Sequence, residues 1–327
     1  MHQYDIRDLR IHFPTRRGVV EAVRGVSFYM DQGECVALVG ESGCGKSVTA
    51  RSLMGLTEVT GGRCQPGSQI LCHGENILDY GKKQWQSYRG REAAMIFQDA
   101  MTSLNPTMQI GHQIAECYRF HQKIGRKEAL EKAAEMLALV GISDPEAALR
   151  RYPHEFSGGM RQRVMIASAL ACQPELLIAD EPTTALDVTI QAQILDLLRN
   201  LKNKINSSIM LITHDLGVIA EMADYVVVMY AGRVVEKGTA EEIFANPAHP
   251  YTIGLMASKP VVGKKVDKLY SIPGKVPNPI NMPDYCYFKD RCEMQVEKCC
   301  GEYPHMIQLS PTHMVSCYRY FDGKVGE

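Results

Sequence analysis

The chain begins with alternating apolar and polar positions, which is typical of strands that bury one face. Residues 4–12 and 22–30 both alternate in this way, and Pro14 and Gly18 supply a turn region between them. The pattern predicts two strands of an antiparallel layer.

Later runs are almost continuously apolar, which predicts strands buried on both faces. These runs are residues 35–39, 92–97, 176–179 and 209–212. We expect residues 225–230 and 233–236 to form a hairpin around Ala231 and Gly232 that closes the sheet. Strands separated by helical segments indicate an α/β fold.

Between residues 110 and 149 the apolar spacing changes to three and four, the period of a helix. Ile114 and Tyr118, and later Ala133 and Leu137, keep this spacing, and Gly141 ends it. The change of period predicts an inserted helical subdomain, at about residues 99–173.

Length and composition limit the class of protein. With 327 residues, 45% of them hydrophobic, the chain is long enough for about two domains. Its formal net charge of −1 indicates no bulk attraction to nucleic acid or anionic lipid. No run approaches about 18 consecutive apolar residues, and no signal segment is recognisable. We therefore expect a cytosolic protein with reduced thiols.

One stretch suits a polyphosphate ligand. It fills the pattern G-x-x-x-x-G-K-[ST] with Gly40, Glu41, Ser42, Gly43, Cys44, Gly45, Lys46 and Ser47. A strand, a glycine loop and a helix N-terminus present several backbone N–H groups to one point. Lys46 would neutralise the β and γ oxygens, and Ser47 would hold Mg²⁺. The alternative is an ordinary strand–turn–helix with a surface lysine.

Polar residues end three of the apolar strands. Gln98 is placed to reach a metal ion or its water. Asp180 and Glu181 come at the sheet edge where ligands bind, and they can divide into a Mg²⁺ ligand and a base that polarises the attacking water. His214 fits a γ-phosphate contact, although a lone histidine is more often structural.

Two further positions fit nucleotide contacts. Ser157, followed by Gly158 and Gly159, begins a helix predicted to run to about Ala171, and its N-terminus suits an anion. A merely capped helix is the alternative. Phe13, at the end of the first strand, suits either stacking on a purine ring or packing in a local core.

In this order the motifs resemble those of the nucleotide-binding subunits of ABC transporters, over roughly residues 3–258. The resemblance implies a P-loop NTPase core that hydrolyses ATP with Mg²⁺. It implies that Phe13 stacks on adenine and that Ser47, Gln98 and Asp180 hold Mg²⁺. It also implies that Glu181 is the catalytic base and His214 the switch histidine. Asp187 would belong to the loop that crosses to a partner subunit.

The stretch from Phe156 to Met160 matches the family signature at its serine and two glycines and departs from it at its first and fifth positions. The resemblance implies a head-to-tail pair of ATPase subunits, as a heterodimer or a homodimer. In such a pair Ser157, Gly158 and Gly159 of one subunit face the phosphate loop of the other.

The last part of the chain, predicted as residues 259–327 after a domain of residues 1–258, is rich in proline and has little periodicity. Five of the eleven cysteines fall here: Cys286, Cys292, Cys299, Cys300 and Cys317. By spacing alone they are compatible with an iron–sulfur cluster, with zinc or with packed free thiols.

This tail and the segment from His249 to Thr252 resemble the oligopeptide/dipeptide importer branch, some of whose members carry a [4Fe–4S] cluster. The resemblance implies Cys286, Cys292, Cys299 and Cys317 as ligands, with Cys300 as a substitute for Cys299. We expect such a cluster to organise the irregular tail.

The resulting expectation is an ATPase subunit that powers peptide import from the cytoplasmic face of the bacterial inner membrane. Its partners would be a second ATPase subunit, two integral membrane permease subunits and, indirectly, an extracytoplasmic solute-binding protein. Nickel or another small solute is an alternative cargo. The rival interpretations are a non-transport ABC ATPase and a regulatory module that binds ATP without turnover, although Glu181 and His214 disfavour the second.

Overall fold

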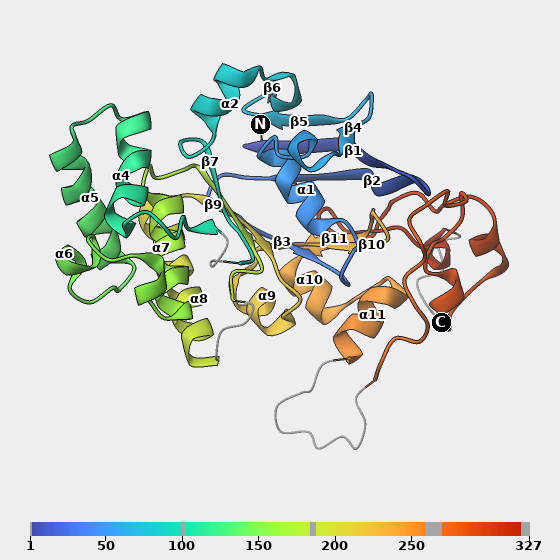
Figure 1. The fold of residues 1–327 in the computed structure, drawn as a ribbon. Coiled ribbons are helices and arrows are strands. Elements are labelled where there is room, and N and C mark those ends of the chain that lie inside the picture. The colour runs from blue at the N-terminus through green and yellow to red at the C-terminus, as the bar shows by residue number, and fades with distance from the viewer. Residues whose placement is uncertain (1, 100–102, 184–187, 259–269, 322–327) are drawn as a thin grey trace. The chain divides into compact units, whose positions relative to one another are not determined.

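The computed structural model describes residues 2–99, 103–183, 188–258 and 270–321 (Figure 1). Contacts within the chain define two compact units. Unit 1 comprises residues 1–29, 36–78 and 214–327, and unit 2 comprises residues 30–35 and 79–213. In the described ranges no helix is long and apolar enough to cross a membrane.

An antiparallel layer in unit 1 contains both strands predicted from the alternating pattern. Its order is β2-β1-β5-β6, with β4 also paired to β1. The bounds are β1 (Tyr4–Thr15), β2 (Gly18–Met30), β4 (Arg63–Cys64), β5 (Gln69–Cys72) and β6 (Glu75–Asn76). Asp8 has a positive φ of 43°, and the buried positions of β1 shift there from Tyr4 and Ile6 to Leu9 and Ile11.

A second sheet in unit 1 carries the phosphate loop. Strand β3 pairs in parallel with β10, β10 forms the predicted hairpin with β11, and β13 adds to β11 with Glu236 opposite Val315. The bounds are β3 (Cys35–Val39), β10 (Tyr225–Tyr230), β11 (Arg233–Thr239), β12 (Ile307–Gln308) and β13 (Met314–Val315). The helices of unit 1 are α1 (Lys46–Leu53), α9 (Leu216–Met222), α10 (Ala240–Ala245) and α11 (Pro250–Ala257), with 3-10 helices η1 (Glu58–Thr60), η4 (Lys289–Arg291), η5 (Glu297–Cys300) and η6 (Tyr318–Tyr320).

The tail is organised by sheet pairing and aromatic packing. Beyond the pairing of β13 with β11, Tyr287 and Phe288 of the tail share a buried core with Tyr230 and Tyr251. The Phe288 ring lies 5.2 Å from that of Tyr230 and 5.4 Å from that of Tyr251. The expectation that a metal cluster is needed to organise this segment is therefore not supported, because the tail shares the core of unit 1.

Unit 2 combines three parallel strands with helices. Strand β8 pairs in parallel with β7 and with β9, which places Asp180 opposite Ile212. The strands are β7 (Ala93–Ile96), β8 (Leu176–Asp180) and β9 (Ser208–Ile212). The helices are α2 (Lys82–Tyr88), α4 (Ile110–His121), α5 (Arg126–Leu139), α6 (Pro145–Ala148), α7 (Gly158–Leu170) and α8 (Val188–Ile205), with η3 (Pro153–Glu155) as a 3-10 turn. Helices α4 to α7, inserted between β7 and β8, pack on one another (Figure 1).

Candidate nucleotide-binding site

The phosphate loop of unit 1 is shaped by glycines that no other residue could replace without strain. Gly40 has φ 149°, and a Cβ there would lie 2.1 Å from the carbonyl oxygen of Met229. Gly45 has φ 102°, and its Cβ would lie 2.6 Å from the carbonyl oxygen of Ala22. Gly43 also has a positive φ, 80°, but faces open space. Close backbone packing therefore fixes both ends of the loop.

The loop leads into α1 with no side-chain cap at Gly45, so the first N–H groups of this helix are not capped by that residue. Lys46 is buried, and its Nζ donates to the carbonyl oxygens of Gly40 at 2.7 Å and Glu41 at 3.1 Å. Burial raises the pKa of the neighbouring Cys44 thiol. Lys46 thus supplies the positive charge of the loop, beside a thiol that stays protonated.

In unit 2, two predicted residues meet at the end of parallel strands. Gln98, which follows β7, donates from Nε2 to Oε2 of Glu181 at 2.8 Å. Glu181 has a positive φ of 49°, and its N–H donates to the carbonyl oxygen of Ile212 at 2.8 Å. Asp180 is 2% exposed at the end of β8. The strand ends therefore hold a buried carboxylate beside a second carboxylate that an amide orients.

The serine–glycine turn of unit 2 begins helix α7. Ser157 Oγ accepts a hydrogen bond from the N–H of Met160, and both Ser157 and Gly158 are exposed. A Cβ on Gly159 would lie 2.9 Å from Ile190, so α8 approaches the backbone closely there. Phe156, at a position where the signature departs from the family pattern, is buried under the guanidinium of Arg151, 4.5 Å from its ring centre.

Comparison with known proteins adds to this geometry. A family model described as "ABC transporter" matches residues 23–184, and one described as "Oligopeptide/dipeptide transporter, C-terminal region" matches residues 235–299. The oligopeptide transport ATP-binding protein AppD of Bacillus subtilis is 48% identical over 97% of this chain and 96% of its own. This chain belongs to the ABC transporter family. As a member of that family it is an ATP-binding protein and an ATPase.

Other relatives of this ABC ATPase carry similar names. The oligopeptide transport ATP-binding protein OppD of Bacillus subtilis is 51% identical over 96% of this chain and 88% of its own. The dipeptide transport ATP-binding protein DppD of Lactococcus lactis is 50% identical over 96% and 90%. Among solved structures, the dimeric bacterial ABC transporter cassette MJ0796 matches 72% of this chain and 98% of its own with TM-score 0.65 at 22% identity, which shows the fold alone.

The remaining predicted nucleotide contacts of this ATPase lie in different surroundings. His214 is exposed just after β9 and precedes Asp215, whose carboxylate caps α9. Phe13 is half-buried at the end of β1, and a Cβ on Gly62 would lie 2.8 Å from its ring, so one edge of the ring packs locally. Ser47 is half-buried in the first turn of α1. Asp187 lies outside the described residues.

The cysteines of the tail do not form a metal centre in the described part of the chain, where no group of three or more His, Cys, Asp or Glu residues is placed to hold an ion. Burial raises the pKa of Cys286 to about 12, and the thiols of Cys299, Cys317 and Cys292 add to the rise. Cys300 is exposed, with Lys289 Nζ 3.9 Å and Gln295 Nε2 3.5 Å from its sulfur. The predicted [4Fe–4S] cluster therefore has no support from the described residues.

Sequence reasoning missed three side chains that contact the motifs. The buried Gln162 of α7 donates to the carbonyl oxygen of Pro182, directly after the acidic pair, at 2.7 Å. Tyr251 and Arg291 both contact Glu41 of the phosphate loop. Gln162 carried a weak signal, because it follows the serine–glycine turn at helical spacing. Nothing in the local sequence indicated the other two contacts.

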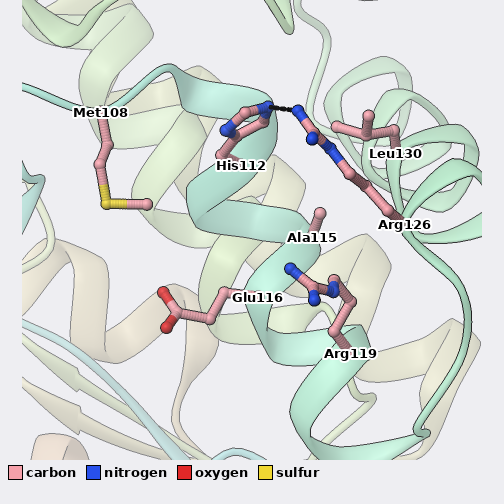
Figure 2. A pocket seen from close by; sticks show the side chains of 7 residues that line it. All are labelled: Met108, His112, Ala115, Glu116, Arg119, Arg126 and Leu130. Atoms are coloured by element: carbon pink, nitrogen blue, oxygen red, sulfur yellow. Dashed lines mark hydrogen bonds between the residues drawn. The ribbon is translucent and has the colours of Figure 1, made fainter.

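A hollow lies apart from the predicted nucleotide contacts of unit 2. Figure 2 shows its lining, and the cavity measures about 340 Å³. It is lined by Met108, His112, Ala115, Glu116, Arg119, Arg126 and Leu130. His112 Nε2 accepts a hydrogen bond from Arg126 Nη2 at 3.1 Å, which links α4 to the first turn of α5. Charges of both signs at an open hollow suit contact with another polypeptide better than burial of an apolar ligand.

Proposed function

We propose that this chain is the ATP-hydrolysing subunit that powers import of dipeptides and oligopeptides through a bacterial ABC transporter. One observation carries the proposal: relatives about 50% identical over nearly the whole chain bear oligopeptide and dipeptide transport names. The match extends into the C-terminal region typical of such transporters. It disfavours a non-transport ATPase. Nickel or another small solute remains the alternative cargo.

We infer the residue roles from the motifs together with their local geometry. ATP binds through the backbone of the phosphate loop, with Lys46 on its phosphates, Phe13 on its adenine and His214 on the γ-phosphate. Glu181 accepts the proton of the water that attacks the γ-phosphorus. The support for this last role is the hydrogen bond from Gln98, which fixes the carboxylate at the strand end.

Mg²⁺ would be held by Ser47, Gln98 and Asp180, whose hydroxyl, amide and carboxylate oxygens are ligands of the kind it prefers. It would neutralise phosphate charge. We also propose that Ser157, Gly158 and Gly159 contact ATP bound to a second ATPase subunit, in a homodimer or a heterodimer. The exposure of Ser157 and Gly158 supports this contact. Asp187 would belong to the same interface.

We infer that permease subunits contact the hollow between α4 and α5. Its support is an open surface of mixed charge on the helical insertion, apart from the proposed nucleotide contacts of unit 2. The subunit would then lie peripherally on the cytoplasmic face of the inner membrane. Arg119→Glu should weaken co-purification with the permease, whereas Lys82→Glu on the exposed face of α2 should not. Equal recovery of the permease with both variants would show that this surface does not contact it.

The [4Fe–4S] assignment is a separate proposal for Cys286, Cys292, Cys299 and Cys317. It rests only on the resemblance of the tail to that of the oligopeptide/dipeptide importer branch, and no group of described residues is placed to hold the metal. Anaerobic purification followed by iron, sulfide and zinc analysis tests it. A folded, metal-free preparation would reject the cluster. Zinc without sulfide would show that these cysteines bind zinc instead of an iron–sulfur cluster.

The decisive experiment for the function is transport. The chain should be purified with its membrane partners, reconstituted in vesicles and supplied with a solute-binding protein and a labelled dipeptide. ATP-dependent uptake that Lys46→Ala abolishes is the expected result. Uptake of nickel but not of peptide would favour the alternative cargo, and the absence of any membrane partner in the purification would reject a transport role.

A further inference from the structure

Arg291 of the tail reaches the phosphate loop of unit 1. Its Nη1 donates to Glu41 Oε2 at 2.7 Å and its Nη2 donates to Glu41 Oε1 at 2.9 Å, so the ion pair is bidentate. The Arg291 side chain is 6% exposed and that of Glu41 is 28% exposed. Two residues separated by 250 positions in the chain are thus joined at the loop.

The surroundings of Arg291 hold its guanidinium in this orientation. Nε donates to the carbonyl oxygen of Pro273 at 2.7 Å, and Nη1 also lies 3.3 Å from the hydroxyl of Tyr230. A Cβ on Gly274 would lie 3.2 Å from Cγ of Arg291, so the chain packs closely along the side-chain stem. The arginine guanidinium stays charged throughout the working range of pH. Contacts other than Glu41 therefore also hold the Arg291 side chain in place.

Glu41 is also held through its backbone. Its N–H donates to the hydroxyl of Tyr251 at 2.7 Å, and its carbonyl oxygen accepts from Lys46 at 3.1 Å. A carboxylate in a loop that receives a polyphosphate would repel the ligand unless its charge is balanced. Arg291 supplies that balance from outside the motif.

We propose that Arg291 is a positioning residue for ATP: acting through Glu41, it neutralises this carboxylate and holds the phosphate loop in the form that receives the triphosphate. The inference rests on the proposed function, because it requires that this loop binds ATP. It gives the C-terminal extension an indirect part in nucleotide affinity, through Glu41.

The test uses the importer purified with its membrane partners and measures the KM for ATP and kcat. Arg291→Met should raise the KM roughly ten-fold and leave kcat within about two-fold, because a charge-assisted contact that organises the bound state is lost. Arg291→Lys keeps the charge without the fork and should give an intermediate KM. Arg319→Met is the matched control, since that tail arginine contacts Met294 and not the loop.

The Glu41→Gln background separates positioning from general stability. If Arg291 acts through Glu41, Arg291→Met should raise the KM much less in that background than in the wild type. An equal rise in both backgrounds, or an unchanged KM in a folded Arg291→Met protein, overturns the inference. If Arg291→Met does not fold, the KM of Arg291→Lys decides. Lys46→Ala tests the site itself: ATP binding that survives this change refutes the proposed function, whereas its loss together with an unchanged KM in Arg291→Met refutes only the inference.

Discussion

Replacing Glu181 by glutamine tests the proposed base with little disturbance of its surroundings. The amide oxygen of the new side chain can still accept the hydrogen bond that Gln98 Nε2 donates at 2.8 Å to Glu181. Glutamine also tolerates the positive φ of 49° no worse than glutamate does. The exchange therefore removes proton acceptance and one negative charge, and little else.

The expected loss follows from the role of a general base. Such a group contributes roughly 10²- to 10⁴-fold in rate, which corresponds to about 2.7 to 5.5 kcal/mol in the activation barrier. ATP affinity should not fall, because the contacts of the phosphate loop are unchanged and a negative charge has left the site. ATP should then accumulate in a closed pair of subunits that hydrolyses it only slowly.

The assay is steady-state ATP hydrolysis by the assembled complex, together with nucleotide retention and subunit association by size-exclusion chromatography. Glu175→Gln is the matched control, because the same exchange then lies just before the other end of strand β8. Near-normal turnover in Glu181→Gln would refute the assignment of the base. Loss of ATP binding in the same variant would show that the carboxylate has a structural role instead.

Three further predictions concern stability. Gly45→Ala should destabilise the fold by about 2 kcal/mol or more, because the new Cβ would lie 2.6 Å from the carbonyl oxygen of Ala22. Gly43→Ala should cost only about 1 kcal/mol, because a Cβ at that position would face open space. Urea unfolding of the two variants measures the difference. Burial lowers the pKa of His249 to about 4, only partly opposed by Glu236, so the folded state favours the neutral ring. The free energy of unfolding should therefore be highest above the unfolded pKa of about 6.5 and should decrease as the pH falls toward 4. The loss should reach about 2 kcal/mol at pH 5 and diminish in His249→Asn, as melting temperatures at pH 7 and pH 5 will show. Gln162→Leu leaves the carbonyl oxygen of Pro182 without its buried donor and should cost about 1 to 3 kcal/mol, whereas an unchanged urea midpoint would mean that this bond adds nothing.

The sequence predicted those parts of the molecule whose structural and functional residues follow one another directly in the chain. Strand β3, the glycine loop and α1 follow one another directly, and the backbone geometry at Gly40 and Gly45 requires glycine there. The run that ends at Asp180 likewise predicts a buried strand from five neighbouring residues. In such stretches the apolar period and the polar residues that follow are read from one short window.

The contacts that the sequence could not predict join distant segments. Tyr251 and Arg291 lie 210 and 250 positions from Glu41, and nothing near any of the three indicates the pairing. The tail shows the same limit. Its prolines and short elements predicted an irregular segment, but β13 pairs with β11 and Phe288 packs against Tyr230. A segment without internal periodicity can still be ordered by packing against the hydrophobic core of another part of the chain. Amino-acid composition does not indicate which core it will pack against.

Glu41 occupies a position that the general nucleotide motif leaves open. The nucleotide pattern specifies glycine, lysine and serine, because backbone approach and phosphate charge require them, but it leaves the position after Gly40 open. That open position is where the backbone N–H bonds Tyr251 and the carboxylate bonds Arg291. A neutral residue there would need no arginine, and an unpaired carboxylate would oppose the phosphates. The bidentate pair with Arg291 balances this carboxylate, so the tail contributes to the charge of the phosphate loop.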